Sequence, residues 1–115
     1  MVPESTVDVA RLADMLAAMG TEPRLRIMRL LLSAHPDGLV VSDIQQELGI
    51  PGPTLSHHLE KLRMNDLAVS RREGTFVRYT VNTESLRELL GFLYAECCGR
   101  NKPMSPEDVL RQCEC

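Results

Sequence analysis

Hydrophobic periodicity changes near residue 66, and this change constrains the fold more than any other feature of the chain. Before it, Leu55, Leu59 and Leu62 recur at helical spacing among polar residues. After it, residues 67–72 and 76–81 alternate between apolar and polar side chains, which is typical of β-strands. A Glu-Gly-Thr stretch joins the two runs and suits the tip of a hairpin. The sequence therefore predicts a helix that is followed directly by a β-hairpin.

Helical patterns dominate the chain before this point. A first helix is expected at residues 6–19, and a second is expected after Thr21, a suitable capping residue, with Pro23 in its first turn. The first helix has one apolar side, formed by Val9, Leu12, Met15, Leu16 and Met19. No repeat or low-complexity linker interrupts the pattern, so a single compact domain accounts for most of the 115 residues.

The third helix is short and leads into the helix that precedes the hairpin. Ser42 and Gln45 have the spacing of a capping box, and Gly49 is placed to end this helix. A fourth helix is expected at residues 53–66, and a fifth after Asn82. A short helix, a tight turn, a polar-faced helix and a basic hairpin make a winged helix-turn-helix, so the predicted fold class is mainly α with a β-hairpin wing.

The fourth helix has a polar side that suits contact with DNA. Thr54, His57 and Lys61 lie roughly opposite the leucine stripe, and Ser56 lies on the flank between them. In a helix-turn-helix, this is the helix that reads base edges. Of the two adjacent histidines, His57 is therefore the better candidate for a base contact. His58 falls on the leucine side and is predicted to lie at the edge of the core.

The hairpin, called the wing below, supplies a second set of basic residues. Arg71, Arg72 and Arg78 lie on its two strands, and we expect two of the three to reach backbone phosphates because alternating positions cannot all face one way. Arg24 and Arg26 are further phosphate-contact candidates or plain surface charges. The net charge of −3 argues mildly against a nucleic-acid partner, but residues 61–78 are locally basic.

All four cysteines lie near the carboxyl end, and the amino-terminal residues suggest where the protein is found. The first twelve residues lack both a basic start and a long apolar run, so neither a signal peptide nor a membrane span is expected and the cytoplasm is the expected location. Thiols stay reduced there, so clustered cysteines indicate metal or redox chemistry more often than a structural disulfide. A strong helix start at residues 105–108 lies between the two cysteine pairs.

The stretches TEPRLRIMRLLL and IPGPTLSHHLEKLRMNDLAVSRREGTFVRYTVN resemble the ArsR/SmtB family of metal-responsive winged-helix repressors. The resemblance covers about residues 7–98. It implies a homodimer built from the first and last helices, bound to operator DNA and released when an inducer binds. We therefore expect residues 1–100 to form a DNA-binding and dimerisation domain and residues 101–115 to form a cysteine-containing tail.

Two inducer sites of the family are missing from this sequence. Arsenite-sensing members carry ELCVCDL where this chain has GLVVSDI, which places Val40 and Ser42 at the cysteine positions. Zinc-sensing members have histidine and acidic ligands on the last helix, and the last helix here has no histidine. What remains is similar to a subgroup that binds trivalent arsenic through a Cys-Cys pair and a third, downstream cysteine.

This similarity and the softness of trivalent arsenic and antimony, which favour thiolate, predict an inducer site at the carboxyl end. Its candidate ligands are Cys97, Cys98, Cys113 and Cys115, with either of the last two as the third ligand. Both adjacent cysteines can bind one ion only if the last helix ends there, because neighbouring helical positions lie about 100° apart.

Three alternatives remain. A thiol-redox sensor would form a disulfide between the adjacent pair and the tail, and a zinc or cadmium sensor would use all four sulfurs. A small thiol enzyme is the least favoured alternative, because the chain has no C-x-x-C motif, no phosphate-binding glycine loop and no carboxylate pair. We therefore expect no catalytic activity and no catalytic cofactor.

Overall fold

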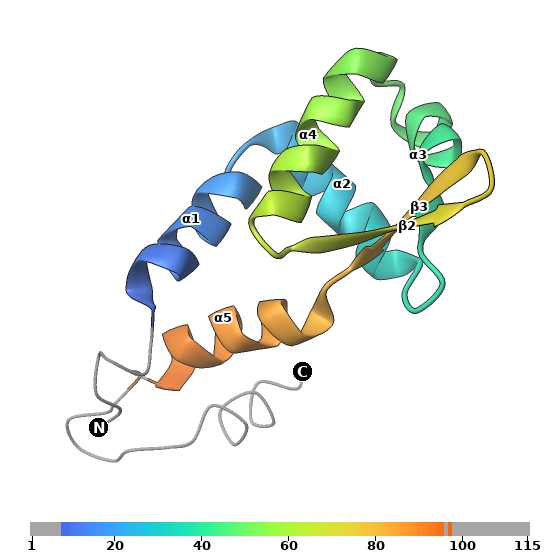
Figure 1. Ribbon diagram of the computed structural model, residues 1–115. Helices are drawn as coiled ribbons and strands as arrows, with labels where there is room; N and C mark the ends of the chain where they lie inside the picture. Colours follow the sequence, from blue (N-terminus) through green and yellow to red (C-terminus); the bar gives the residue numbers. More distant parts are fainter. Residues whose placement is uncertain (1–7, 96, 98–115) are drawn as a thin grey trace. The chain divides into compact units, whose positions relative to one another are not determined.

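A computed structural model describes residues 8–95 and Cys97 (Figure 1). The chain divides into two compact units, residues 10–82 and a unit formed by residues 1–9 together with residues 83–115. The expected boundary between residues 100 and 101 lies outside the described residues, as does the helix start at 105–108. In the described residues, no helix combines the length and apolar composition that crossing a bilayer requires.

Two helices open the chain. Helix α1 spans Val9–Met19 and buries Leu12, Met15 and Ala18. Helix α2 spans Glu22–Ser33 and starts after Thr21 as expected, but the Thr21 side chain makes no capping hydrogen bond. The predicted apolar side of α1 is only partly buried, because Val9 and Leu16 are each 45% exposed.

Helices α3 and α4 form the helix-turn-helix. Helix α3 spans Val41–Leu48, and Gly49 ends it in the left-handed conformation with φ 65°, as predicted. The predicted capping box is wrong, because the helix begins one residue before Ser42 and its capping position is Val40. Helix α4 spans Gly52–Met64 and ends two residues earlier than predicted, at a turn in which Asp66 adopts a φ of 61°.

The predicted hairpin is present and gains a third strand. Strands β2 (Ala68–Glu73) and β3 (Phe76–Val81) pair antiparallel, and Gly74 lies at the tip with φ 64°. A two-residue strand, β1 (Leu39–Val40), pairs antiparallel with the other edge of β3. Such a short strand has no periodicity that a sequence pattern can reveal.

Gly38 is the residue that lets β1 approach β3. It follows the turn at residues 34–37, where its N–H donates to the Ala34 carbonyl at 2.9 Å, and its φ is +73°. A Cβ at this position would lie 2.2 Å from the Tyr79 carbonyl oxygen, so only glycine fits.

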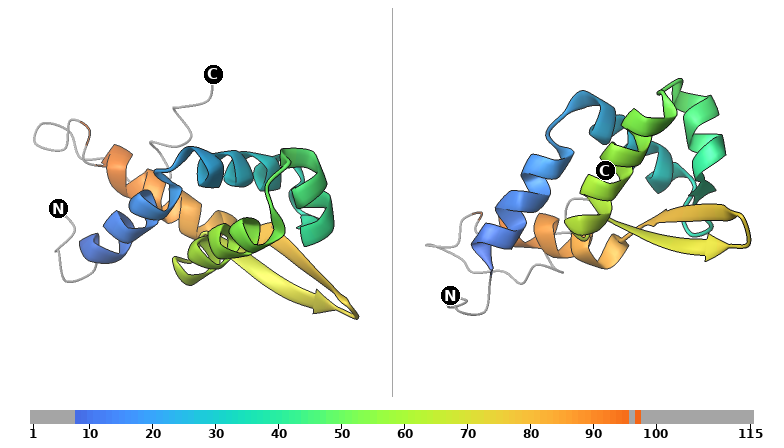
Figure 2. Two further views of the ribbon diagram at one scale, coloured as in Figure 1. Left: turned by 90° about the horizontal axis from the view of Figure 1, so that it is seen from above. Right: turned by 45° about the horizontal axis from the view of Figure 1, so that its top comes forward.

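The core of this unit lies between the helices and the inner face of the sheet. The wing projects beyond the helices, with α4 lying between it and α1 (Figure 2). The alternation predicted for β3 is confirmed, because Tyr79 and Val81 are buried whereas Phe76 is exposed. Core side chains with at most 1% exposure are contributed by α1, α2, α3, α4 and the turn after α4: Met15, Ile27, Met28, Leu31, Ile44, Leu55, Leu59, Leu62 and Leu67.

Helix α5 spans Thr83–Ala95 and forms the described part of the second unit, as expected from the pattern after Asn82. Leu89 is buried, whereas Leu90, Leu93 and Tyr94 are 39%, 48% and 44% exposed. The helix ends at Ala95, and the Cys97 N–H donates to the Tyr94 carbonyl at 2.9 Å. Cys97 thus lies in a turn and not in the regular helix, and its partner Cys98 lies outside the described residues.

Candidate nucleic-acid interface

Helix α4 is fixed by its apolar side and exposes its polar side. Leu55, Leu59 and Leu62 are at most 1% exposed and pack the helix against the core. The four candidate contact residues on the other side are all exposed: Thr54, Ser56, His57 and Lys61. The arrangement predicted from the helical wheel is therefore confirmed, and contact of these side chains with DNA stays a prediction.

His58 lies at the edge of the core, as predicted. Its ring is part-buried, and its Nδ1 lies 3.4 Å from Nη1 of Arg24, which can donate to it when His58 is neutral. Burial, the Arg24 charge and then the neighbouring His57 lower the pKa of His58 from its ordinary value of 6.5. These effects favour the neutral form of the imidazole beside the guanidinium.

The strand register separates the three wing arginines. Arg71 lies opposite Arg78 across the hairpin, so both occupy one face, whereas Arg72 lies opposite Val77 on the other face. Val77 and Tyr79 line a cavity together with Ser56 and Glu60 of α4. Arg72 is therefore on the wing face that is turned toward α4, and it is exposed.

Glu73 forms ion pairs with Arg71 and Arg78, which lie on the wing face opposite to that of Arg72. This role was not predicted from the sequence. Its carboxylate accepts hydrogen bonds from Arg71 and, at 3.0 Å, from Nε of Arg78. These two bonds, with that from Arg71 first, lower the pKa of Glu73. The i, i+2 spacing from Arg71 indicates the first bond, but only the hairpin register reveals the second. Among the described residues, Arg72 is the only wing arginine that makes no ion pair.

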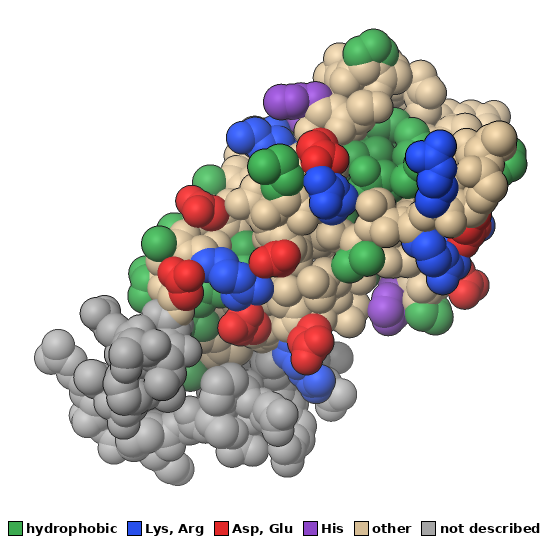
Figure 3. Space-filling model, viewed as in Figure 1, with side chains coloured by type: hydrophobic (Ala, Val, Ile, Leu, Met, Phe, Trp, Pro, Cys, Tyr) green, Lys and Arg blue, Asp and Glu red, His purple; other side chains and the backbone are tan. Residues whose placement is uncertain are grey.

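Basic side chains lie over both α4 and the wing, with acidic side chains among them (Figure 3). Most of the acidic groups near α4 and the wing are already paired. Glu60 accepts from Nε of Arg63 at 3.1 Å, and Asp66 accepts from Nε of Arg11 at 3.3 Å. Of the cations at residues 61–78, Arg63, Arg71 and Arg78 are thus paired with carboxylates, whereas Lys61 and Arg72 form no ion pair in the described chain.

Of the four candidate thiol ligands, the structure describes one. Cys97 is exposed two positions after the last residue of α5, whereas Cys98, Cys113 and Cys115 lie outside the described residues. Across residues 8–95 and Cys97, no three His, Cys, Asp or Glu side chains come together in a way that could hold a metal ion. Val40 and Ser42 lie at the start of α3, where their side chains offer no thiol.

Comparison with known proteins decides the family. A helix-turn-helix domain model matches residues 19–71. The HTH-type transcriptional regulator MJ1325 of Methanocaldococcus jannaschii is 35% identical over 68% of this chain and 85% of its own length. The arsenical resistance operon repressor of Staphylococcus xylosus is 32% identical over 65% of this chain and 69% of its own length. The chain belongs to the ArsR/SmtB family.

The family also includes a solved neighbour with the same architecture. The structure of HlyU from Vibrio cholerae matches with a TM-score of 0.60 and 33% identity, covering 76% of this chain and 96% of that one. HlyU is named a transcriptional activator, whereas the Staphylococcus protein is named a repressor. Like these ArsR/SmtB proteins, the chain is a DNA-binding transcription regulator with a winged helix-turn-helix.

Proposed function

We propose that this protein is a homodimeric repressor that leaves its operator when trivalent arsenic or antimony binds its carboxyl-terminal thiolates. The observation that carries the proposal is the combination of an α4 with an exposed polar face and a relative named as an arsenical resistance operon repressor. The ligands are Cys97, Cys98 and either Cys113 or Cys115, because thiolate is the natural ligand of these soft ions.

DNA recognition in this proposal uses α4 for sequence and the wing for affinity. Thr54, Ser56 and His57 lie near the start of α4, where recognition helices contact base edges. Lys61 and Arg72 have no acidic partner in the described chain, so their charges are available to phosphates. Arg71 and Arg78 can contribute to phosphate binding only when their ion pairs with Glu73 break.

Dimer formation is supported by exposed apolar side chains on the two helices that the family uses for it. Helix α1 exposes Leu16, and α5 exposes Leu90 and Leu93. Large apolar side chains that recur on one helix commonly mark a protein interface. Two copies present two recognition helices, which must match half-sites about 34–36 Å apart.

In the proposed release step, binding of an ion to the thiols changes the spacing of the two recognition helices. Cys97 lies two positions after the last residue of α5, so an ion that draws the cysteines together would shift the end of a dimer helix. A small shift spoils simultaneous docking of the two recognition helices. The coupling required is modest, since about 1–3 kcal/mol changes affinity roughly 5–150-fold.

Anaerobic titration of a protein–DNA complex, followed by fluorescence anisotropy, tests the proposal. The DNA probe is a duplex that the protein selects from a random-sequence pool. Arsenite should lower affinity without oxidant, and Cys97→Ser or Cys98→Ser should keep DNA binding but abolish this response. Cys113→Ser and Cys115→Ser, tested singly, identify the third ligand.

Three outcomes would contradict the thiol site as proposed. Normal arsenite responses in both Cys97→Ser and Cys98→Ser would exclude the adjacent pair as ligands. Release by oxidant alone would support redox sensing instead. Release by zinc or cadmium with a requirement for all four cysteines would support a divalent-metal sensor.

A further inference from the structure

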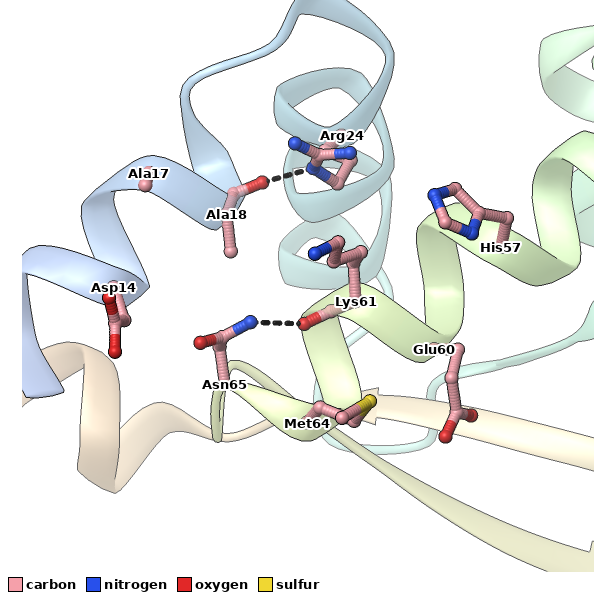
Figure 4. A pocket seen from close by; sticks show the side chains of 9 residues that line it. All are labelled: Asp14, Ala17, Ala18, Arg24, His57, Glu60, Lys61, Met64 and Asn65. Carbon is pink, nitrogen blue, oxygen red and sulfur yellow. Dashed lines mark hydrogen bonds between the residues drawn. The ribbon is translucent and has the colours of Figure 1, made fainter.

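A cleft of about 600 Å³ lies between α1, α2 and the second half of α4, within the unit formed by residues 10–82 (Figure 4). Three of its lining side chains are basic: Arg24 from α2 and His57 and Lys61 from α4. In the close view these three face a common space, whereas Asp14 and Glu60 lie toward its edges (Figure 4). The cleft therefore has a cationic centre.

Arg24 is held in this cleft by neutral groups. Its Nε donates to the Ala18 carbonyl at the end of α1, and its Nη1 lies 3.4 Å from Nδ1 of His58. Neither acceptor is a carboxylate, so the guanidinium keeps its full charge. Among the described residues nothing binds its Nη2, which leaves two N–H donors for a ligand.

Three other arginines of α1, α2 and α4 are paired with carboxylates, unlike Arg24 and Lys61. Arg11 pairs with Asp66, Arg26 with Glu22 and Arg63 with Glu60. The Glu60 carboxylate at the edge of the cleft is thus already occupied. Arg24 and Lys61 form no ion pair in the described chain, and Asp14 lies at the edge of the cleft, so two cations without a paired carboxylate face its common space (Figure 4). Like charges brought together in this way favour an anion between them.

From these observations we infer that the Arg24–His57–Lys61 cleft binds a phosphodiester of the DNA strand that borders the groove entered by α4. The ligand class is an anionic phosphate, because the guanidinium offers paired donors and the ammonium a compact charge. The source is DNA, because His57 and Lys61 belong to the exposed side of α4. The inference rests on the proposed DNA-binding function and adds a phosphate contact on the side of α4 that the wing does not reach.

The test measures operator affinity by fluorescence anisotropy over a salt series, using the selected duplex and the full-length chain. Arg24→Gln should reduce the slope of log affinity against log salt by about 0.9 for each phosphate that the variant no longer neutralises. Arg24→Lys keeps the charge and should largely restore the slope. Arg26→Gln is the matched control, because Arg26 lies on the same helix but does not line the cleft, and its pair with Glu22 favours the plain surface charge over the phosphate contact of the two sequence-based alternatives. Circular dichroism establishes that each variant is folded.

A second arm locates the phosphate. A series of duplexes carries one neutral methylphosphonate each, at successive positions of the backbone. At one position in each half-site, the methylphosphonate should weaken binding of the wild-type protein relative to the unmodified duplex but should leave binding of Arg24→Gln unchanged. An unchanged salt slope in folded Arg24→Gln would overturn the inference. So would competition by inorganic phosphate at matched ionic strength without any methylphosphonate effect, which would assign the cleft to a free anion. Failure of wild type to bind any duplex would instead refute the proposed function.

Discussion

At the scale of single residues, Glu73 controls how much positive charge the wing presents. It neutralises Arg71 and Arg78 on one wing face and leaves Arg72 exposed on the face turned toward α4. These pairs are partly exposed, so they contribute little to stability, and their main effect is on where the charges point. In the proposed function, we expect a wing restrained in this way to add affinity without strong attraction to every DNA sequence.

Glu73→Gln should therefore raise affinity for both selected and scrambled duplexes. The released arginines can reach additional phosphates, so the salt slope should steepen by about 0.9 for each additional phosphate neutralised. Anisotropy titrations across a salt series measure both effects. Glu22→Gln on α2 is the control, since it breaks a comparable exposed pair with Arg26 away from the wing. Equal effects of the two substitutions would contradict a specific role for Glu73.

His58 gives stability a dependence on pH. Its pKa is lowered in the folded chain, first by burial and then by Arg24 and His57, so the unfolded chain binds its proton more tightly. The free energy of unfolding should therefore fall as the pH drops from the ordinary value of 6.5 through the lowered one. The lowered carboxyl pKa values of Glu60 and Glu73 act only below about 4.5, which is a separate window.

Urea denaturation at several pH values between 5 and 7.5 checks this expectation, with the range chosen around the ordinary histidine pKa of about 6.5. His58→Gln should flatten the fall in unfolding free energy, whereas His57→Gln should leave most of it. If His57→Gln flattened the curve as strongly as His58→Gln, the exposed histidine would carry the effect and the assignment to His58 would be wrong.

At the scale of elements, the third strand depends on one glycine. Strand β1 joins the sheet because the backbone at Gly38 adopts a φ of +73° and passes close to Tyr79. This pairing adds a short strand to the free edge of β3, beside the start of α3. The helix-turn-helix and the wing are thereby joined through hydrogen bonds as well as through the core.

Gly38→Ala should be more destabilising than Gly74→Ala. Both glycines have positive φ, which costs an L-residue about 1–2 kcal/mol. Gly74 has nothing within 4 Å of an added Cβ, whereas at Gly38 the Cβ would lie 2.2 Å from the Tyr79 oxygen. Thermal or urea unfolding of the two variants measures the difference. A smaller cost at Gly38 than at Gly74 would mean that β1 does not hold this position.

At the scale of the whole molecule, the proposed function requires two copies acting on one DNA dyad. The apolar side chains exposed on α1 and α5 are the candidate contact surface between copies. Two linked half-site contacts bind more tightly than one by an effective-concentration term, which commonly amounts to about 10²–10⁴-fold. Anything that changes the separation of the two α4 helices therefore acts on a large part of the affinity.

Leu93→Glu should convert the dimer to monomers and lower operator affinity by about 10²–10⁴-fold, because it places a charge on the proposed α5 interface. Sedimentation equilibrium and anisotropy measure the two effects. Leu25→Glu is the control, since Leu25 is 57% exposed on α2, outside the proposed interface. Dissociation caused by Leu25→Glu but not by Leu93→Glu would place the dimer contact on α2.

The sequence by itself determined the order of helices and the hairpin, the buried leucine side of α4 and the exposed polar side. These features depend on periodicities of 3.6 and 2, which are properties of neighbouring residues. Because such patterns involve only neighbouring residues, they do not report contacts between distant parts of the chain. The capping box at Ser42 was wrong because β1 pairing sets where α3 begins. The pattern placed Leu16 on the apolar side of the first helix but did not show that the side chain is 45% exposed, because helical spacing gives the side on which a residue lies and not whether the fold covers it.

Only the tertiary structure decided which charges are free. Arg24 meets His58 across 34 positions of sequence, and Arg78 meets Glu73 only because the hairpin register places them together. A charged side chain is neutralised or left available by whatever the fold brings within a few ångströms, since Coulomb energy depends on distance in space and not on separation along the chain. The candidate phosphate-binding residues of this regulator are therefore selected by its packing, from a larger set of basic residues that its sequence supplies.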